Sequence, residues 1–221
     1  MVDQILIGII GEGPTDHVVL ESIITGYTGN KNISFTPLQP KEGEPGNWDR
    51  VLNYCGSSDF KSAFTNPDLI VVVQIDTDVF GTENVPKDKA ISGMEKLSVL
   101  EIVAAMRDQL IAEMSAAFYK ALETRILFAI SVHEIECWFL PVYFSNNKKK
   151  AATTKGCISR LNEELTKANE GFYVDGKDLG NYRKLCRHFK KKKDLLVFGK
   201  LNESLGIFIG ELKKLPLENE V

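Results

Sequence analysis

Two aspartates separated by one residue, Asp76 and Asp78, follow directly after the largely apolar run of residues 69–75. An apolar run without regular polar alternation indicates a strand that is covered on both faces. Ligands of parallel sheets gather at the carboxyl ends of the strands, where this pair would lie. Because side chains alternate along a strand, both carboxylates can point to one side and share a cation. The pair therefore predicts a divalent-metal site.

A third carboxylate, Glu12, lies between two glycines just after the first apolar segment, residues 2–10. The glycines allow a sharp turn into a helix, so Glu12 also belongs at the carboxyl end of a strand. Amide groups at the start of that helix could receive an anion, which makes Gly13 and Thr15 candidate phosphate contacts. Thr15 and Asp16 also fit the ordinary pattern of helix-start residues.

Glu134 and Glu136 follow a further apolar segment, residues 125–132. A helix that begins near His133 would turn the two glutamates to different faces, so the sequence leaves open which of them faces the site. Glu134 and Glu12 are candidate metal ligands, and Glu136 is a candidate catalytic base. His133 could shuttle a proton, although a single histidine is more often a packing or surface residue.

Carboxylates gathered in this way repel one another unless a proton or a cation neutralises them. Oxygen ligands without a His and Cys cluster favour Mg²⁺ or Mn²⁺ over zinc. Magnesium often completes its shell with substrate phosphate, which favours phosphoryl transfer or phosphodiester hydrolysis. The cysteines are widely spaced and form no CxxC pair, so we expect reduced structural thiols at Cys55, Cys137, Cys157 and Cys186.

The elements that would position these carboxylates alternate between strand and helix. Strands are predicted at residues 2–10, 33–38, 69–75 and 125–132, and helices at about 15–25 and 95–124. This alternation predicts an α/β fold with right-handed crossovers and a mainly parallel central sheet flanked by helices. The breaker-rich segment 79–92 leaves the carboxyl end of the central strand, as a substrate-contact segment would.

The C-terminal third is predicted to be helical, with helices at 158–168, 181–192 and 204–215 and a polar connection at 194–202. We expect an α/β domain over residues 1–145 and a basic helical extension over 146–221 that packs on it. Residues 146–200 carry 15 Lys and Arg against 6 Asp and Glu, although the whole chain has a net charge of −3. Such polarity suits an enzyme that acts on a polyanion, but the lysines could equally form a solvated surface. The candidate nucleic-acid contacts are Arg183, Lys184, Arg187, Lys190 and Lys191.

The N-terminal residues lack the basic region of a signal peptide, and the following apolar run is too short to span a bilayer. We therefore expect a cytoplasmic protein without membrane association.

The order of these motifs resembles the Toprim domain of topoisomerases, bacterial primases, recombination factors and the nucleases of overcoming-lysogenization-defect proteins. The motifs are Gly-Glu-Gly-Pro-Thr-Asp at 11–16, Asp-Thr-Asp at 76–78, Glu-Cys-Trp at 136–138 and Ser-Leu-Gly-Ile-Phe at 204–208. Together they resemble most closely a small stand-alone Toprim-like family of uncharacterised function, over nearly the whole chain.

This resemblance implies a Rossmann-like sheet in which Asp76 and Asp78 hold magnesium. It gives Glu12 the part of a general acid or base, with Glu136 as a further ligand or base. No tyrosine lies in a topoisomerase context and the zinc ribbon of primases is missing, so neither of those activities is transferred.

The resulting hypothesis is a magnesium-dependent Toprim-fold phosphodiesterase, a nuclease that acts on DNA or RNA. One alternative is a non-catalytic metal-binding or nucleic-acid-binding component of a multi-protein system such as phage defence. Another is a phosphohydrolase for small phosphates. A partner ATPase and a homodimer are both compatible with the leading hypothesis.

Overall fold

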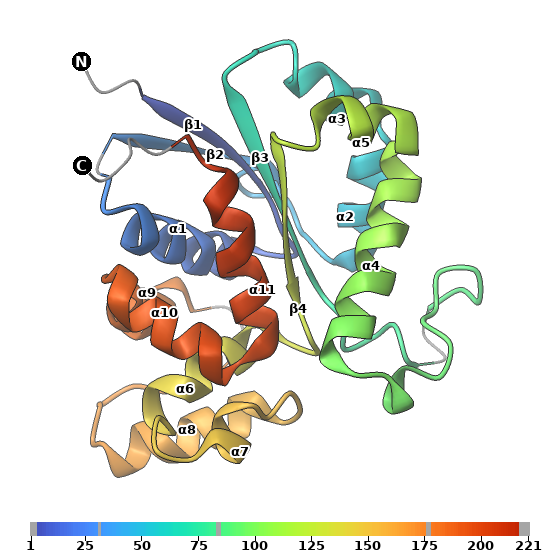
Figure 1. Cartoon of the computed structure of the whole chain (residues 1–221). Helices are drawn as coiled ribbons and strands as arrows, with labels where there is room; N and C mark the ends of the chain where they lie inside the picture. Colours follow the sequence, from blue (N-terminus) through green and yellow to red (C-terminus); the bar gives the residue numbers. More distant parts are fainter. Residues whose placement is uncertain (1–3, 31, 83–84, 176–177, 217–221) are drawn as a thin grey trace.

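Four parallel strands form the centre of the chain, in the order β2 (Ile33–Gln39), β1 (Ile5–Ile10), β3 (Leu69–Asp76) and β4 (Ile126–Ser131). The computed structural model describes residues 4–30, 32–82, 85–175 and 178–216. Helices cover both faces of the sheet and make up the C-terminal part of the chain (Figure 1). The predicted α/β class with a parallel, helix-flanked sheet is confirmed, and the predicted membership of Toprim stays a prediction.

β3 is the apolar strand on which the sequence prediction was centred, and it lies between β1 and β4. Alternate side chains enter two separate cores: Val71, Val73 and Ile75 pack on one side, and Ile70 and Val72 on the other. Burial on both faces explains why the strand lacks regular polar alternation.

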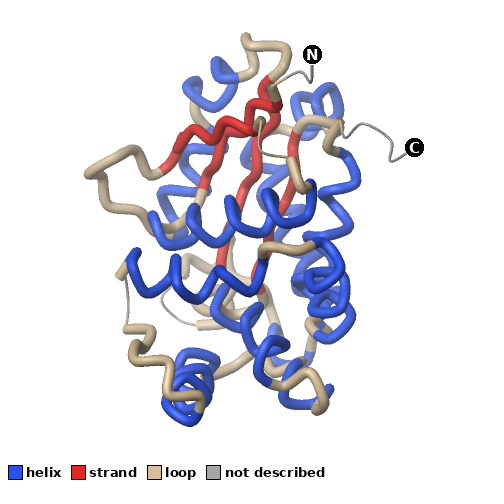
Figure 2. Tube along the Cα trace, turned by 90° about the vertical axis from the view of Figure 1, so that its left-hand side faces the viewer, coloured by secondary structure: helices blue, strands red, loops and turns tan. Residues whose placement is uncertain are grey.

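The first face of the sheet is covered by α1 (Pro14–Thr28), α9 (Leu179–Leu185), α10 (Lys192–Leu201) and α11 (Glu203–Glu211). Figure 2 looks onto this face, with these helices in front of the strands. α11 packs along β4, where Phe208 stacks on Trp138 and the Trp138 indole N–H donates to Ser204 Oγ at 2.9 Å. The C-terminal helices therefore share one hydrophobic core with the sheet.

The second face is covered by α2 (Trp48–Gly56), α3 (Ser58–Ala63), α4 (Val99–Met114) and α5 (Ala116–Leu122). Short helices follow β4: η2 (Ile135–Phe139), α6 (Leu140–Tyr143), α7 (Lys148–Ala151) and α8 (Cys157–Lys167). α6 to α8 lie at the end of the molecule towards which β3 and β4 run (Figure 1). The remaining short helices are η1 (Met94–Lys96), η3 (Cys186–Phe189) and η4 (Leu212–Lys214).

The long helix predicted over residues 95–124 differs from the observed structure. The helix expected over 95–124 begins only at Val99, after the capping box of Ser98 and Glu101, and breaks at Ser115, which has a φ of 71°. The Ser115 side chain accepts from Phe118 N and so starts α5.

The predicted polar connection at 194–202 is wrong, because Lys192–Leu201 forms α10. Its Gly199 lies against Gly206 of α11: a Cβ added at Gly206 would be 2.4 Å from the Gly199 carbonyl oxygen. Close packing of α10 against α11 therefore stabilises a helix where the polar residues had predicted a loop.

The expectation of four reduced cysteines is also wrong, because Cys137 and Cys157 form a disulfide that links η2 to the start of α8. The residues are 20 positions apart and became neighbours only through tertiary packing. Cys55 and Cys186 are free and buried, as expected, and burial raises the pKa of the Cys186 thiol to about 12.

In the part of the chain that the structure describes, no helix is both long and apolar enough to cross a membrane.

Breaking the disulfide should destabilise the protein without unfolding it. For a loop of this length, the entropy of the unfolded chain predicts a loss of about 3 kcal/mol in the free energy of unfolding. Urea denaturation with and without reductant would measure the loss. The Cys137→Ser/Cys157→Ser variant is the control, because its unfolding should not respond to reductant. Four free thiols in the untreated native protein would contradict the bond.

Candidate functional site

The carboxyl ends of β1 and β3 lie side by side at the position where the strand order reverses direction. β1 connects to β2 on one side and pairs with β3 on the other, so a crevice is expected outside the ends of these two strands. Glu12 follows β1, and Asp76 ends β3. Glu12 Oε1 accepts the backbone N–H of Asp76 at 2.8 Å, which joins the two strand ends directly.

Gln74 is the hub of the hydrogen bonds around these strand ends. Its fully buried side chain accepts from Glu12 N through Oε1 at 3.2 Å and donates through Nε2 to Asp76 Oδ1 at 2.9 Å. Ser131, paired with Asp76 in the register of β3 and β4, donates its hydroxyl to the same Oδ1. Both hydrogen bonds to the Asp76 carboxylate therefore end on one oxygen and fix its orientation.

Asp76 lies in a cluster of like charges. Burial raises the pKa of Asp76 well above its ordinary value of 3.8. The neighbouring carboxylates of Glu12, Asp16 and Glu136 raise this pKa further. The hydrogen bond from Ser131 lowers the pKa, but it is the smallest of these effects. A cation at this position would remove the repulsion that raises the pKa.

Glu136 is the glutamate of the 134–136 pair that lies beside Asp76. Its side chain is buried in η2 and accepts a hydrogen bond from the hydroxyl of Tyr182, a residue of α9. Burial raises the pKa of Glu136, and the hydrogen bond from Tyr182 partly opposes this shift in pKa. A carboxylate with a raised pKa is a stronger base than an ordinary glutamate.

Glu134 is directed elsewhere. Its Oε1 accepts the backbone N–H groups of Cys157 at 2.7 Å and Ile158 at 3.1 Å, so it caps the first turn of α8. Glu134, Cys137 and Cys157 are a group whose ligand atoms all lie within 4.8 Å of one another, but the two sulfurs are bonded to each other. Sulfurs in a disulfide are not thiolate ligands, and Glu134 serves as a helix cap in this state.

Asp78 lies in the turn that follows β3 and is exposed, whereas Asp76 is partly buried. The backbone N–H groups of Thr77 and Asp78 both donate to His133 O, at 2.9 and 3.1 Å, and Thr77 Oγ1 accepts from His133 N at 2.9 Å. His133 has a φ of 65°, a conformation stabilised by these hydrogen bonds. Asp78 and the His133 side chain line a cavity next to the strand ends.

The donor set fits a hard divalent cation. The side chains around Asp76 offer carboxylate, amide and hydroxyl oxygens. Within the described residues, no three of these carboxylates bring their oxygens within 4.8 Å of one another, so they do not form a closed cage. Magnesium does not need one, because it is commonly held by one or two carboxylates together with waters and substrate phosphate.

The predicted phosphate contacts at the start of α1, Gly13 and Thr15, are both buried. Gly13 is the N-cap of α1 in an extended conformation, its carbonyl accepts from Asp16 N at 3.2 Å, and Thr15 is buried. His17 is buried as well, and its Nε2–H donates to Gln39 O at 3.0 Å, which ties α1 to β2. Gly46 packs against the backbone of the turn after β1, since a Cβ at position 46 would lie 2.2 Å from Glu12 O.

The predicted basic contacts are exposed but lie along α1 rather than at the strand ends. Arg187 pairs with Glu170, and Lys184 Nζ lies 5.3 Å from the centre of the Phe172 ring. Residues 189–190 contact the distal turn of α1, where Lys192 Nζ lies 5.2 Å from the centre of the Tyr27 ring. Arg183, Lys190 and Lys191 are exposed on the same segment.

No protein-family model matches this sequence. No curated protein and no solved structure matches it either. The resemblance to Toprim therefore stays a prediction, and the chemistry is argued from the side chains alone.

Sequence reasoning missed Gln74, Ser131 and Tyr182, and gave Asp16 only a capping role. Gln74 carried a usable signal, because a buried amide inside an apolar strand needs polar partners. Ser131 carried a weaker one at the end of β4. Tyr182 carried none, since only the packing of α9 against the sheet brings it to Glu136.

Replacing Asp76 by Asn should stabilise the metal-free protein at neutral pH. Because the pKa of Asp76 is higher in the folded state than in the unfolded state, stability falls as pH rises from about 4 through the folded pKa. The Asp76→Asn variant loses this contribution, and at pH 7 it should gain more than the ~0.5 kcal/mol of an ordinary surface change. Urea denaturation in EDTA from pH 4 to pH 8 would measure it.

Asp68→Asn is the matched control, because Asp68 is exposed at the opposite end of the same strand. Added Mg²⁺ should stabilise the unsubstituted protein and the control, but not Asp76→Asn. Equal pH dependence in all three proteins would rule out a carboxylate cluster at Asp76.

Proposed function

We propose that this protein is a magnesium-dependent phosphodiesterase that hydrolyses the phosphodiester bonds of nucleic acid. The observation that carries the proposal is the partly buried Asp76 with Glu12, Asp16 and Glu136 around it at the switch point of a parallel sheet. Buried carboxylates that repel one another cost folding free energy, and packing alone gives no reason to place them together. A divalent cation together with an anionic substrate gives such a reason.

Asp76 and Glu12 would hold the cation, with Asp78 reaching it from the adjacent turn. Gln74 and Ser131 act as positioning residues, because their hydrogen bonds fix the Asp76 carboxylate. Bound Mg²⁺ supplies charge neutralisation of the phosphate and orientation of its oxygens.

Glu136 would act as the general base. Its raised pKa favours taking a proton from a water molecule, and Tyr182 holds the carboxylate in place. The water oxygen forms the new bond to phosphorus, the bond from phosphorus to the leaving oxygen breaks, and solvent protonates that oxygen. Glu134 has no part in this step, since it caps α8.

The exposed cations between residues 183 and 193, from α9 to the start of α10, would bind the polynucleotide backbone away from the scissile phosphate. They lie beside α1, whose 15 residues extend roughly 22 Å from the strand ends. Contacts of this kind add affinity without sequence readout.

Phosphodiester hydrolysis should depend on the carboxylates at the switch point. Asp76→Asn/Asp78→Asn should lower the rate at least about 100-fold, as expected when electrostatic stabilisation of the transition state is lost. Labelled single-stranded and double-stranded DNA and RNA, incubated with Mg²⁺, Mn²⁺ or EDTA, would provide the substrates. Asp68→Asn should keep full activity. Cleavage that persists in the double variant, or in EDTA, would remove the metal site from the mechanism.

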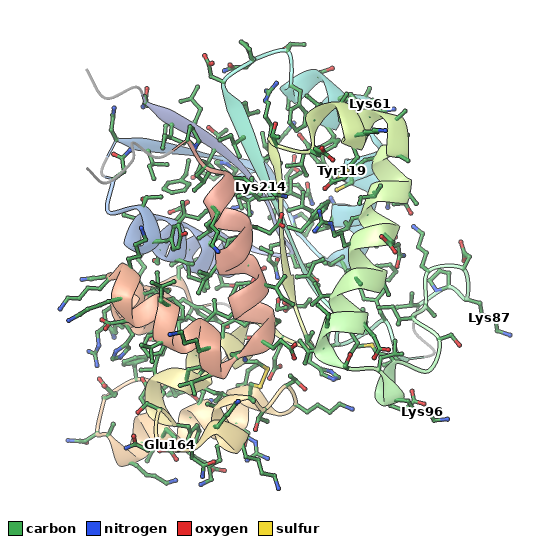
Figure 3. The ribbon with its side chains drawn as sticks, viewed as in Figure 1. Lys61, Lys87, Lys96, Tyr119, Glu164 and Lys214 are labelled. Atoms are coloured by element: carbon green, nitrogen blue, oxygen red, sulfur yellow. A yellow bond between two sulfur atoms is a disulfide. The ribbon has the colours of Figure 1, made fainter. Side chains whose placement is uncertain are left out.

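Neutralising Lys190, Lys191 and Lys193 to Gln should weaken polynucleotide binding. The slope of log affinity against log salt should fall by up to about 0.9 for each lysine that contacts a phosphate. Turnover of a small phosphodiester, bis(p-nitrophenyl) phosphate, should stay unchanged. The matched control neutralises Lys61, Lys120 and Lys213, which are exposed elsewhere; Lys61 lies at the opposite end from α7 and α8 (Figure 3). Equal loss of binding in both triple variants would show a non-specific charge effect.

A further inference from the structure

A cavity of about 340 Å³ lies next to the candidate site, between the segment after β3, the end of β4, the start of α4 and the connection before α8. Asp78 and His133 form its border with the strand ends. The hydrolysis proposed above requires only an open edge with a metal, so the cavity is an additional feature that calls for its own explanation.

One part of the cavity wall is apolar. It consists of Met94, Leu97, Val99, Ile102 and Val132, and the thioether of Met94 packs against Gly81. The segment that carries Met94 is held by backbone hydrogen bonds, including Ile91 N to Phe80 O at 2.8 Å and Met94 N to Ile91 O at 3.3 Å. The cavity is therefore largely formed before any ligand binds, as small-molecule sites usually are.

The rest of the lining is polar: Thr82, Glu95 and Thr154 lie in the wall, and Asp78 and His133 lie where the cavity meets the strand ends. Lys155 is an exposed cation at the same border. Lys87 and Lys96 lie on the described residues 85–98 outside the cavity, and both project into solvent (Figure 3). A ligand that fits this arrangement has a flat apolar part for the interior and an anionic part directed towards Lys155 and the metal.

We propose that the cavity binds the base of a single unpaired nucleotide, whose phosphate then lies between Lys155 and the carboxylates of Asp76 and Asp78. Apolar walls accept the faces of a heterocyclic base, and a methionine sulfur contacts aromatic rings favourably. A paired base inside a duplex cannot enter. This inference rests on the proposed function and narrows its substrate to free nucleotides or to unpaired strand ends.

The test is calorimetric titration of the full chain in Mg²⁺, because the probes contain no phosphodiester bond and therefore report binding without the proposed hydrolysis. AMP, GMP, CMP and UMP are the probes, and ribose 5-phosphate is the control without a base. The four nucleotides should bind at least about tenfold more tightly than ribose 5-phosphate, a difference of ~1.4 kcal/mol. Lys155→Gln should weaken binding of AMP but leave binding of adenosine unchanged.

Leu97→Trp fills the cavity, and Leu100→Trp is its matched control because Leu100 is 58% exposed and does not line the cavity. Leu97→Trp should weaken AMP binding about tenfold or more, whereas Leu100→Trp should leave it within about twofold. Both variants should show the same thermal unfolding midpoint, which establishes that the tryptophan is tolerated.

Competition against AMP then identifies the source of the nucleotide. A linear single strand that competes where a circular strand of equal length fails assigns the cavity to strand ends, and failure of both assigns it to free nucleotides. Equal binding of nucleotides and ribose 5-phosphate, or unchanged binding in Leu97→Trp, overturns the proposal. Metal-dependent hydrolysis can persist in that case, so the cavity and the proposed function fail separately.

Discussion

Repulsion between carboxylates is the constraint on which this structure depends. Asp76 is partly buried with three other acids close enough to raise its pKa, an arrangement that costs folding free energy whenever the group is charged. The fold tolerates this cost because each surrounding element supplies a compensating contact. Gln74 and Ser131 donate to Asp76, and the Asp76 N–H donates to Glu12. The hydrogen bonds that lower the cost of burying Asp76 also fix the orientation of its carboxylate.

The topology of the sheet explains why these contacts meet. β1 and β3 are neighbours although α1, β2, α2 and α3 separate them in the sequence, so residues 12 and 76 become adjacent only because the strand order reverses at β1. Residues 74, 76 and 131 lie on the face of β3 and β4 that packs on α1, in line with the apolar residues of that face. They are polar because they lie near the carboxyl ends of the strands. A hydrophobic core that ends in hydrogen-bonded polar groups gives a rigid base for the site.

Much of this was predictable from local patterns, and the rest was not. Buried parallel strands are largely apolar, so the carboxylates that follow them stand out in the sequence. This pattern places Glu12, Asp76 and Glu136 at the carboxyl ends of the strands. The different roles of Glu134 and Glu136 were not predictable, since they depend on α8 arriving at one residue and α9 at the other. The Cys137–Cys157 bond has the same origin: spacing along the chain carries no information about a contact made by packing. The break at Ser115 depends on a left-handed residue that helix periodicity does not reveal.

The C-terminal helices are best understood as part of the site. Without α9, the buried Glu136 would lose its hydrogen bond to Tyr182, and a buried carboxylate without a donor is costly. Without α11, Trp138 would lose both its stacking partner Phe208 and the hydroxyl of Ser204, and η2 would lose its support. An α/β domain that ended near residue 145 would therefore expose the very segment that carries Glu136. The C-terminal helices and the carboxylate cluster must fold together, because these helices supply the contacts that hold η2 and Glu136.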